Sequence, residues 1–346
     1  MHIHMLGICG TFMGSIAQLA KQLGHEVTGC DSHVYPPMSS QLENAGIELI
    51  EGYHSGQLKP SPDLVIIGNA LSRGNPCVEY VLDHRIPYKS GPQWLGETVL
   101  TNRHVLAVAG THGKTTTSSM LTFILQSAGL DPGYLIGGVP INTGSSAELG
   151  TGKHFVVEAD EYDSAFFDKR SKFLHYHTDT LLINNIEYDH ADIFDDLEAI
   201  KTQFHHLVRT LPSSGAVVFP SGDKVINSVL ERGCWSQKLS FGFDEGDWHC
   251  RLLDQSSRFE IMNSETNSIH RRHVNWELNG IHNVLNGVAA IVAAQHVGVS
   301  VEESCEILAG FSGVRRRMET LYDKGGFVLY DDFAHHPTAI EATLTA

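Results

Sequence analysis

The sequence predicts an α/β protein built from more than one domain. An apolar strand, a glycine turn and a helical pattern follow one another twice, starting near residue 2 and again near residue 104. Short continuous apolar runs occur at residues 64–67, 155–157 and 181–183, as in strands buried on both faces of a parallel sheet. With 346 residues, the chain is long enough for two or three domains of about 100–150 residues each.

The composition indicates an acidic protein without a membrane span. Lys and Arg number 24 against 40 Asp and Glu, a formal net charge of −16, which does not favour binding to nucleic acid. The sequence shows no signal peptide and no apolar run of about 18 residues. Its six cysteines form no C-x-x-C pair. We therefore expect a cytoplasmic protein with no membrane or nucleic-acid partner. The oligomeric state cannot be read from the sequence.

The first unit opens with a strand, a glycine turn over residues 7–14, a helix over residues 15–23 and a second strand that ends at Asp31. The turn departs from the dinucleotide pattern G-x-G-x-x-G, because Cys9 stands where the second glycine would be. Asp31 lies at about the distance expected of an acid that binds a ribose. The turn by itself leaves NAD and any other nucleotide diphosphate open as ligands.

The strongest motif is a phosphate-binding loop between the strand at residues 104–109 and a helix. Its letters are GTHGKTTT, residues 110–117. It is a variant P-loop, because Val108 occupies the position of the usual first glycine. Lys114 is expected at the β- and γ-phosphates and Thr115 at Mg²⁺. The predicted ATP-phosphate contacts are Gly110, Thr111, His112, Gly113, Lys114, Thr115 and Thr116.

Two polar segments follow neighbouring buried strands. EADE, residues 158–161, follows the strand at 155–157, and NNIEYDH, residues 184–190, follows the strand at 181–183. Carboxyl ends of parallel strands meet at one sheet edge, where ligands bind, and carboxylate oxygens suit Mg²⁺. We expect both segments to converge on one metal–phosphate site.

The C-terminal part contributes two more motifs. Arg315, Arg316 and Arg317 form a basic cluster in an acidic chain. It is either a solvated linker or an arginine clamp on ATP phosphates. DDFAHHPT, residues 331–338, follows a strand expected at 327–330 and is placed to contact nucleotide ribose or phosphate. Between residues 235 and 278 the alternating pattern predicts β-hairpins.

Taken together, these motifs resemble the Mur ligase family in content and order, essentially from end to end. The segments at residues 7–14, 35–39, 90–94 and 167–171 look most like its tripeptide-adding members. The resemblance implies that ATP phosphorylates the carboxylate of UDP-N-acetylmuramate. The amine of the tripeptide L-Ala-γ-D-Glu-meso-diaminopimelate then attacks the acyl phosphate. This chemistry belongs to peptidoglycan recycling, and the implied cofactors are ATP and Mg²⁺.

The resemblance also implies roles for residues of this chain. The catalytic residues would be Lys114, Glu158, His190 and Arg317. One Mg²⁺ would lie on Thr115 and Glu158, and a second on Glu158 and His190. The adenine side would be His282, Asn283 and Asn286, and the third domain would supply Arg317, Asp332 and His335. The UDP-sugar contacts would be Gly7, Gly10, Thr11, Phe12, Met13, Asp31 and Asn69.

The implied domains are a UDP-sugar-binding Rossmann-like domain at residues 1–103, a central ATP-binding P-loop domain at 104–314 and the start of a third Rossmann-like domain at 315–346. Because most of that third domain would be missing, we expect a truncated chain that binds UDP-sugar but turns over poorly alone. Four other readings stay open: a ligase that adds L-alanine, a chain that only binds nucleotide or UDP-sugar, and, outside the family, a nicotinamide oxidoreductase or a P-loop kinase.

Overall fold

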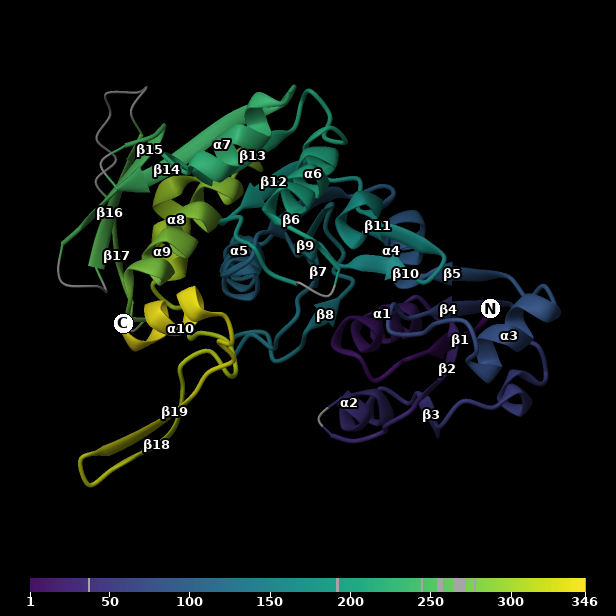
Figure 1. The fold of residues 1–346 in the computed structure, drawn as a ribbon. Coiled ribbons are helices and arrows are strands. Elements are labelled where there is room, and N and C mark those ends of the chain that lie inside the picture. The colour runs from purple at the N-terminus through teal and green to yellow at the C-terminus, as the bar shows by residue number, and fades with distance from the viewer. Residues whose placement is uncertain are drawn as a thin grey trace. The chain divides into compact units, whose positions relative to one another are not determined.

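The computed structural model divides the chain into two compact units (Figure 1). Unit 1 comprises Met1–Arg103, Ala147–Leu149 and Tyr162–His177, and unit 2 comprises His104–Ser146, Gly150–Glu161 and Thr178–Ala346. The structure describes residues 1–36, 38–190, 193–243, 245–253, 258–263, 272–276 and 278–345. Among these residues, no helix is long and apolar enough to cross a membrane.

Unit 1 is a parallel sheet in the order β3-β2-β1-β4-β5. Its strands are β1 His2–Leu6, β2 Glu26–Asp31, β3 Glu48–Glu51, β4 Leu64–Ile67 and β5 Tyr88–Ser90. Its α-helices are α1 Thr11–Gln22, α2 Met38–Asn44, α3 Pro76–Asp83 and α4 Gly91–Leu95, with a 3-10 turn at Ser55–Leu58 and a π-helical turn at Gly96–Leu100. The strand order reverses between β1 and β4, so the glycine turn after β1 opens at a topological switch point, where α/β sheets bind ligands.

Helix α1 begins at Thr11 rather than at the expected residue 15. Gly14 therefore lies inside the helix, in its first turn. A Cβ there would overlap the side chain of Met38 from α2. The close approach of the Met38 side chain, and not the turn, therefore favours glycine at this position.

Unit 1 also contains a hairpin of β10 Asp163–Ala165 and β11 Asp168–Ser171, followed by the 3-10 turn Lys172–His175. The short strand β8, Ala147–Glu148, packs beside α1. These segments are distant in sequence from residues 1–103 but belong to the same compact unit.

Unit 2 is built on a larger sheet, whose order from one edge is β17-β16-β15-β14-β13-β12-β6-β9-β7. The strands are β6 His104–Ala109, β7 Gly133–Leu135, β9 His154–Ala159, β12 Thr180–Ile183, β13 Ala216–Pro220, β14 Gln237–Phe243, β15 Trp248–Leu252, β16 Arg258–Asn263 and β17 Arg272–Asn275. The helices are α5 Lys114–Ser127, α6 Leu197–Val208, α7 Lys224–Glu231, α8 Ile281–His296 and α9 Val301–Leu308. Helices α5 and α8 share one hydrophobic core with the sheet, and the small residues of α8 let the two helices pack closely.

The hairpins expected over residues 235–278 occur only in part. Strand β14 is parallel to both β13 and β15, and antiparallel pairing begins with β15, β16 and β17. The alternating pattern does not distinguish a parallel edge from a hairpin when the strand has one exposed face.

The C-terminal segment forms the hairpin β18 Glu319–Lys324 and β19 Phe327–Asp331, then α10 Pro337–Leu344. The predicted strand at 327–330 and the helix starting at Pro337 are thereby confirmed. Figure 1 shows the hairpin in yellow near the C-terminus. Most of its side chains are exposed.

Candidate functional site

The phosphate loop connects β6 to α5, and asparagine side chains hold its shape. Gly113 has a left-handed φ of +79°, and a Cβ there would lie 2.7 Å from both Asn184 Nδ2 and Asn286 Oδ1. The His112 N–H donates to Asn185 Oδ1 at 2.8 Å, and Asn184 Nδ2 donates to the His112 carbonyl at 3.2 Å. The loop after β12 and helix α8 therefore fix the conformation of the phosphate loop.

Lys114, the first residue of α5, lies among carboxylates. Its Nζ is 3.3 Å from Glu161 Oε2 and 3.4 Å from Asp160 Oδ1, and its side chain is only 11% exposed. Burial lowers the pKa of Lys114, but Glu161, Asp160 and Glu158 outweigh it and raise the pKa above its ordinary value. The loop therefore keeps a full positive charge where phosphates are expected.

Thr115 and Glu158 form an oxygen pair beside this charge. Thr115 Oγ1 donates to Glu158 Oε1 at 3.0 Å, and the Gly137 N–H donates to Glu158 Oε2 at 2.7 Å. Burial raises the pKa of Glu158, and Lys114 opposes that shift. Two hard oxygen donors at this spacing fit Mg²⁺, which takes carboxylate and hydroxyl oxygens next to phosphates.

The predicted convergence of the two strand ends is confirmed. Strands β9 and β12 flank β6 in parallel, so EADE and NNIEYDH lie at the same sheet edge. One contact between the two segments is an ion pair of His190 Nε2 with Glu161 Oε1 at 3.1 Å. Burial lowers the pKa of His190, but Glu161 and then Asp189 raise it to a net value above normal.

Glu161 is the residue that sequence reasoning missed at this edge. The sequence assigned His190 to a metal shared with Glu158, whereas the structure places His190 on Glu161. Glu161 is 2% exposed and contacts both Lys114 and His190. Its place in EADE was the available signal, but the motif alone does not tell which acid faces the loop.

The C-terminal segment brings some of its predicted residues to the loop. Arg317 Nη2 donates to Thr115 Oγ1 at 3.3 Å, and its guanidinium lies 5.3 Å from the centre of the Phe333 ring. Asp332 accepts from the N–H groups of Met318 and Ala334 at 2.8 and 2.7 Å. Asp332 thereby fixes the backbone on both sides of the hairpin.

The predicted adenine-side residues separate into two groups. Asn286 is buried against Gly113. Burial lowers the pKa of His282, and the charge of Asp332 opposes that shift. Asn283 Nδ2 instead donates to the Asn279 carbonyl, and His335 is exposed with Nδ1 3.2 Å from the Phe333 carbonyl.

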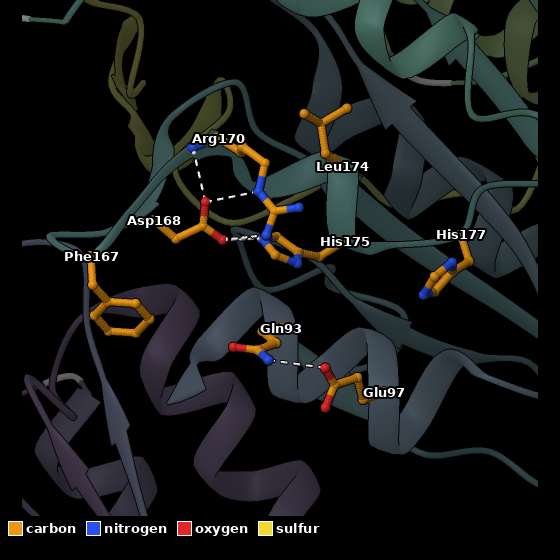
Figure 2. A pocket seen from close by; sticks show the side chains of 8 residues that line it. All are labelled: Gln93, Glu97, Phe167, Asp168, Arg170, Leu174, His175 and His177. Atoms are coloured by element: carbon orange, nitrogen blue, oxygen red, sulfur yellow. Dashed lines mark hydrogen bonds and ion pairs between the residues drawn. The ribbon is translucent and has the colours of Figure 1, made fainter. Parts of the chain in front are cut away.

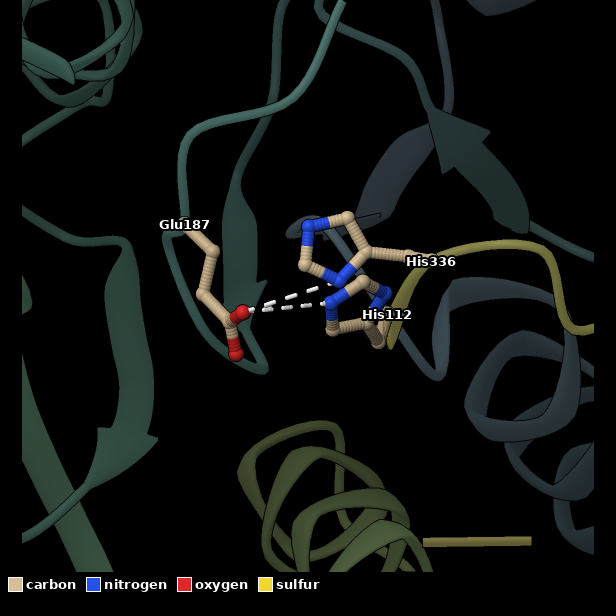
Figure 3. A group of neighbouring side chains, drawn as sticks. All are labelled: His112, Glu187 and His336. Carbon is tan, nitrogen blue, oxygen red and sulfur yellow. Dashed lines mark ion pairs between the residues drawn. The ribbon is translucent and has the colours of Figure 1, made fainter. Parts of the chain in front are cut away.

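The neighbouring His336, which the sequence did not single out, reaches the phosphate loop. Figure 3 shows it with His112 and Glu187. The two imidazole rings have centroids 4.5 Å apart. Burial lowers the pKa of His112, with Glu187 opposing and His336 adding to the decrease.

The glycine turn of unit 1 is closed by hydrogen bonds to the end of β2. The Gly7 N–H donates to the Cys30 carbonyl at 2.8 Å, and the Cys9 N–H donates to Asp31 Oδ2 at 2.9 Å. Asp31 thus holds the turn with one oxygen, while Tyr53 OH lies 3.5 Å from the other. Burial and Asp31 raise the pKa of Tyr53.

The other residues predicted for the UDP-sugar differ in exposure. Thr11 is exposed and Phe12 partly buried at the start of α1, whose N-cap is Gly10, and Asn69 follows β4 at the switch point. Met13 is only 5% exposed, so its side chain belongs to the core of the unit.

Unit 1 also has a cavity of about 500 Å³, drawn in Figure 2. Asp168 is its charged centre: it accepts from Arg170 Nη2 at 2.7 Å and lies 2.9 Å from His175 Nε2. The Arg170 hydrogen bonds lower the pKa of Asp168 to about 2. The lining residues are Gln93, Glu97, Phe167, Asp168, Arg170, Leu174, His175 and His177. Residues from two of the segments singled out in the sequence, 90–94 and 167–171, therefore line the same cavity.

Comparison with known protein families identifies the class of protein. The description "Mur ligase family, catalytic domain" matches residues 2–103, and "Mur ligase middle domain" matches residues 108–294. The chain belongs to the Mur ligase family and is a ligase that forms C–N bonds. The predicted α/β class and family resemblance are both confirmed.

Individual members of the family differ in how similar they are to this chain. The chain is 56% identical to the UDP-N-acetylmuramate–L-alanyl-γ-D-glutamyl-meso-2,6-diaminoheptandioate ligase of Escherichia coli K12, over 100% of this chain and 75% of that protein. It is 34% identical to the UDP-N-acetylmuramate–L-alanine ligase of Syntrophomonas wolfei, over 99% of this chain and 73% of that one. The crystal structure of a murein peptide ligase from Psychrobacter arcticus matches with a TM-score of 0.90 at 49% identity, over 100% of this chain and 75% of that one.

Proposed function

We propose that this protein is an ATP-dependent ligase that joins the carboxylate of UDP-N-acetylmuramate to the amine of L-Ala-γ-D-Glu-meso-diaminopimelate. The observation that carries the proposal is the buried Lys114 beside the Thr115–Glu158 oxygen pair. A positive charge and a magnesium-type oxygen pair at a helix N-terminus serve phosphoryl transfer. The name of the Escherichia coli relative, at 56% identity, supplies the substrates.

The proposed reaction has two steps. The sugar carboxylate attacks the γ-phosphorus of ATP, which gives an acyl phosphate and ADP. The acceptor amine then attacks the acyl carbon, and phosphate leaves from the tetrahedral intermediate as the amide bond forms. Enzymes accelerate such transfers mainly by positioning and by neutralising charge.

The residues of this chain have distinct parts in that scheme. Lys114 holds the γ-phosphoryl oxygens, and Arg317, already bound to Thr115, adds a second cation. Mg²⁺ would be held by Thr115 and Glu158 and would neutralise phosphate charge when bound. Whether a second ion uses Glu158 with His190 stays part of the proposal, because His190 contacts Glu161 here.

In this proposal the UDP-sugar binds to unit 1 and the nucleotide binds to unit 2. We assign the UDP-sugar to the turn residues Gly7, Gly10, Thr11, Phe12 and Met13, with Asp31 and Asn69. The adenine side is assigned to His282, Asn283 and Asn286, with Asp332 and His335 on the C-terminal segment. We keep domain ranges of 1–103, 104–314 and 315–346 for these roles.

The tripeptide is favoured over L-alanine as acceptor. Identity to the tripeptide-adding relative is 56%, against 34% for the L-alanine-adding one, over nearly the same share of the chain. None of the six cysteines forms a disulfide bond in the structure, which is usual in a reducing compartment. We therefore place the reaction in the cytoplasm.

A paired assay tests the proposal. The chain is incubated with ATP, Mg²⁺ and UDP-N-acetylmuramate, with tripeptide or with L-alanine, and ADP and the amide product are followed by mass spectrometry. Product with tripeptide alone supports the assignment, and product with L-alanine alone replaces it with the alternative acceptor. In parallel, calorimetry measures binding of UDP-N-acetylmuramate in competition with NAD. Sugar binding without turnover would reduce the chain to a binding protein, and NAD binding would mean that the glycine turn has been misassigned.

A further inference from the structure

Three side chains with metal-ligand chemistry meet in unit 2, although they come from three separate segments. His112 lies in the phosphate loop, Glu187 in the loop after β12, and His336 directly before α10 (Figure 3). One donor atom from each lies within 4.8 Å of the other two. The shared point is Glu187 Oε2, at 3.5 Å from His112 Nε2 and 3.8 Å from His336 Nδ1.

Hydrogen bonding within the described part of the chain does not account for this arrangement. His112 Nε2 and His336 Nδ1 are buried atoms without a hydrogen-bond partner there. Both distances to the carboxylate oxygen exceed the usual range of about 2.7–3.2 Å for an N–H···O bond. Buried polar atoms are normally satisfied, so two unsatisfied nitrogens that face one carboxylate indicate a group that binds between them.

Glu187 itself is held in position. Thr338 Oγ1 in α10 donates to Glu187 Oε2 at 2.8 Å. A hydrogen bond to a ligating carboxylate is a common second contact in metal sites, where it fixes the ligand's orientation. The same helix therefore orients Glu187 and carries His336 at its N-terminus.

We propose that His112, Glu187 and His336 form a binding site for a divalent transition-metal ion such as Zn²⁺. Two imidazole nitrogens and one carboxylate oxygen are a ligand set that zinc accepts, with a fourth position left open. Tetrahedral zinc, with ligand bonds of about 2.0–2.1 Å, places neighbouring ligand atoms about 3.3–3.5 Å apart. The two distances to Glu187 need to contract by a few tenths of an ångström, and the two histidine nitrogens, which lie within 4.8 Å of each other, close on the ion as well.

This site differs chemically from the magnesium pair. Mg²⁺ prefers oxygen ligands, whereas imidazole favours zinc, copper, nickel and iron. Thr115 and Glu158 offer oxygens only, and His112, Glu187 and His336 offer mainly nitrogen. The consequence of zinc binding would be to tie the start of α10 to the phosphate loop.

The test measures zinc binding to the full chain by competition with a chromophoric chelator, in excess Mg²⁺ so that oxygen sites are occupied. We expect one equivalent of Zn²⁺ to bind more tightly than the remaining sites. His336→Ala and Glu187→Gln should each weaken that equivalent at least tenfold. His335→Ala is the matched control, because His335 is the adjacent histidine and is exposed; it should bind as the parent does. Circular dichroism without metal confirms that each variant is folded.

Cobalt substitution identifies the ligands independently. Co²⁺ in this site should give visible d–d bands without a thiolate charge-transfer band, and His336→Ala should remove the bands. Absence of a tight equivalent, retention of it in His336→Ala or Glu187→Gln, its loss in His335→Ala, or a thiolate band from one of the cysteines would each overturn the proposal.

Discussion

Glu161 is predicted to be the main charged support of the active site, and Glu161→Gln tests this. The substitution keeps the size and one oxygen but removes the charge that faces Lys114 and His190. At 3.3 Å, the attraction between Lys114 and Glu161 is about 5 kcal/mol with an effective dielectric constant of about 20. Much of this is offset by desolvation, and Asp160 still faces Lys114. We therefore expect a net loss of about 2 kcal/mol.

The measurement is thermal unfolding by calorimetry. A loss of about 2 kcal/mol corresponds to a decrease of about 4–8 °C in Tm for a unit of this size. Asp160→Asn is the matched control: it also faces Lys114, but Asp160 is 35% exposed, so its loss should be under about 1 kcal/mol. Equal Tm values for Glu161→Gln and the parent protein would refute the reasoning.

The pH dependence gives a second readout of the same variant. The pKa of His190 is raised in the folded protein, so its protonation adds stability below its unfolded pKa of about 6.5, and that stability is lost as pH rises through the folded pKa. The stability difference between parent and Glu161→Gln should therefore shrink as pH rises above about 6.5, down to the part due to Lys114. A difference that grows over that window would contradict the assigned ion pair.

Three further predictions concern other parts of the chain. Lys114→Met should reduce amide formation by at least ~100-fold in a phosphate-release assay, while calorimetric binding of UDP-N-acetylmuramate stays unchanged; unchanged turnover would remove Lys114 from the mechanism. Gly113→Ala should destabilise the protein by about 2–3 kcal/mol in thermal unfolding. Gly129 has a similar φ but open space around it, so Gly129→Ala should cost only about 1 kcal/mol. Equal losses would show that contact with Asn184 and Asn286 is unimportant. The parent protein should be more stable than Asp168→Asn above about pH 4, because the pKa of Asp168 is depressed in the folded state. This difference in stability should disappear as the pH falls to about 2, which acid titration followed by circular dichroism measures. A difference that does not change with pH would mean that the ion pairs of Asp168 with Arg170 and His175 do not form.

The local parts of the site could be predicted from the sequence because each rests on a few consecutive residues. The strand–loop–helix around Lys114 is such a case, and so are the acids that follow β9. The sequence could not predict which side chain each acid contacts. His190 and Glu161 lie close together only because β12, β6 and β9 are neighbours in the sheet. The sequence also could not tell which of the adjacent histidines, His335 or His336, faces the phosphate loop, since adjacent side chains before a helix point in different directions. The acceptor and the UDP-sugar contacts stay predictions.

The charge balance around the phosphate loop links nucleotide binding to Mg²⁺ binding. Lys114 is already paired with Glu161 and Asp160, and Glu158 also acts on its charge, so this one lysine faces three carboxylates at the position assigned to the phosphates. An incoming polyphosphate would be repelled unless a divalent cation bound with it, and Glu158 with Thr115 provides the oxygens for that cation. Lys114 must then exchange its carboxylates for phosphate oxygens, and Glu161 keeps His190 as its remaining cationic partner. Nucleotide and Mg²⁺ should therefore bind as a pair, each strengthening the other by the same factor.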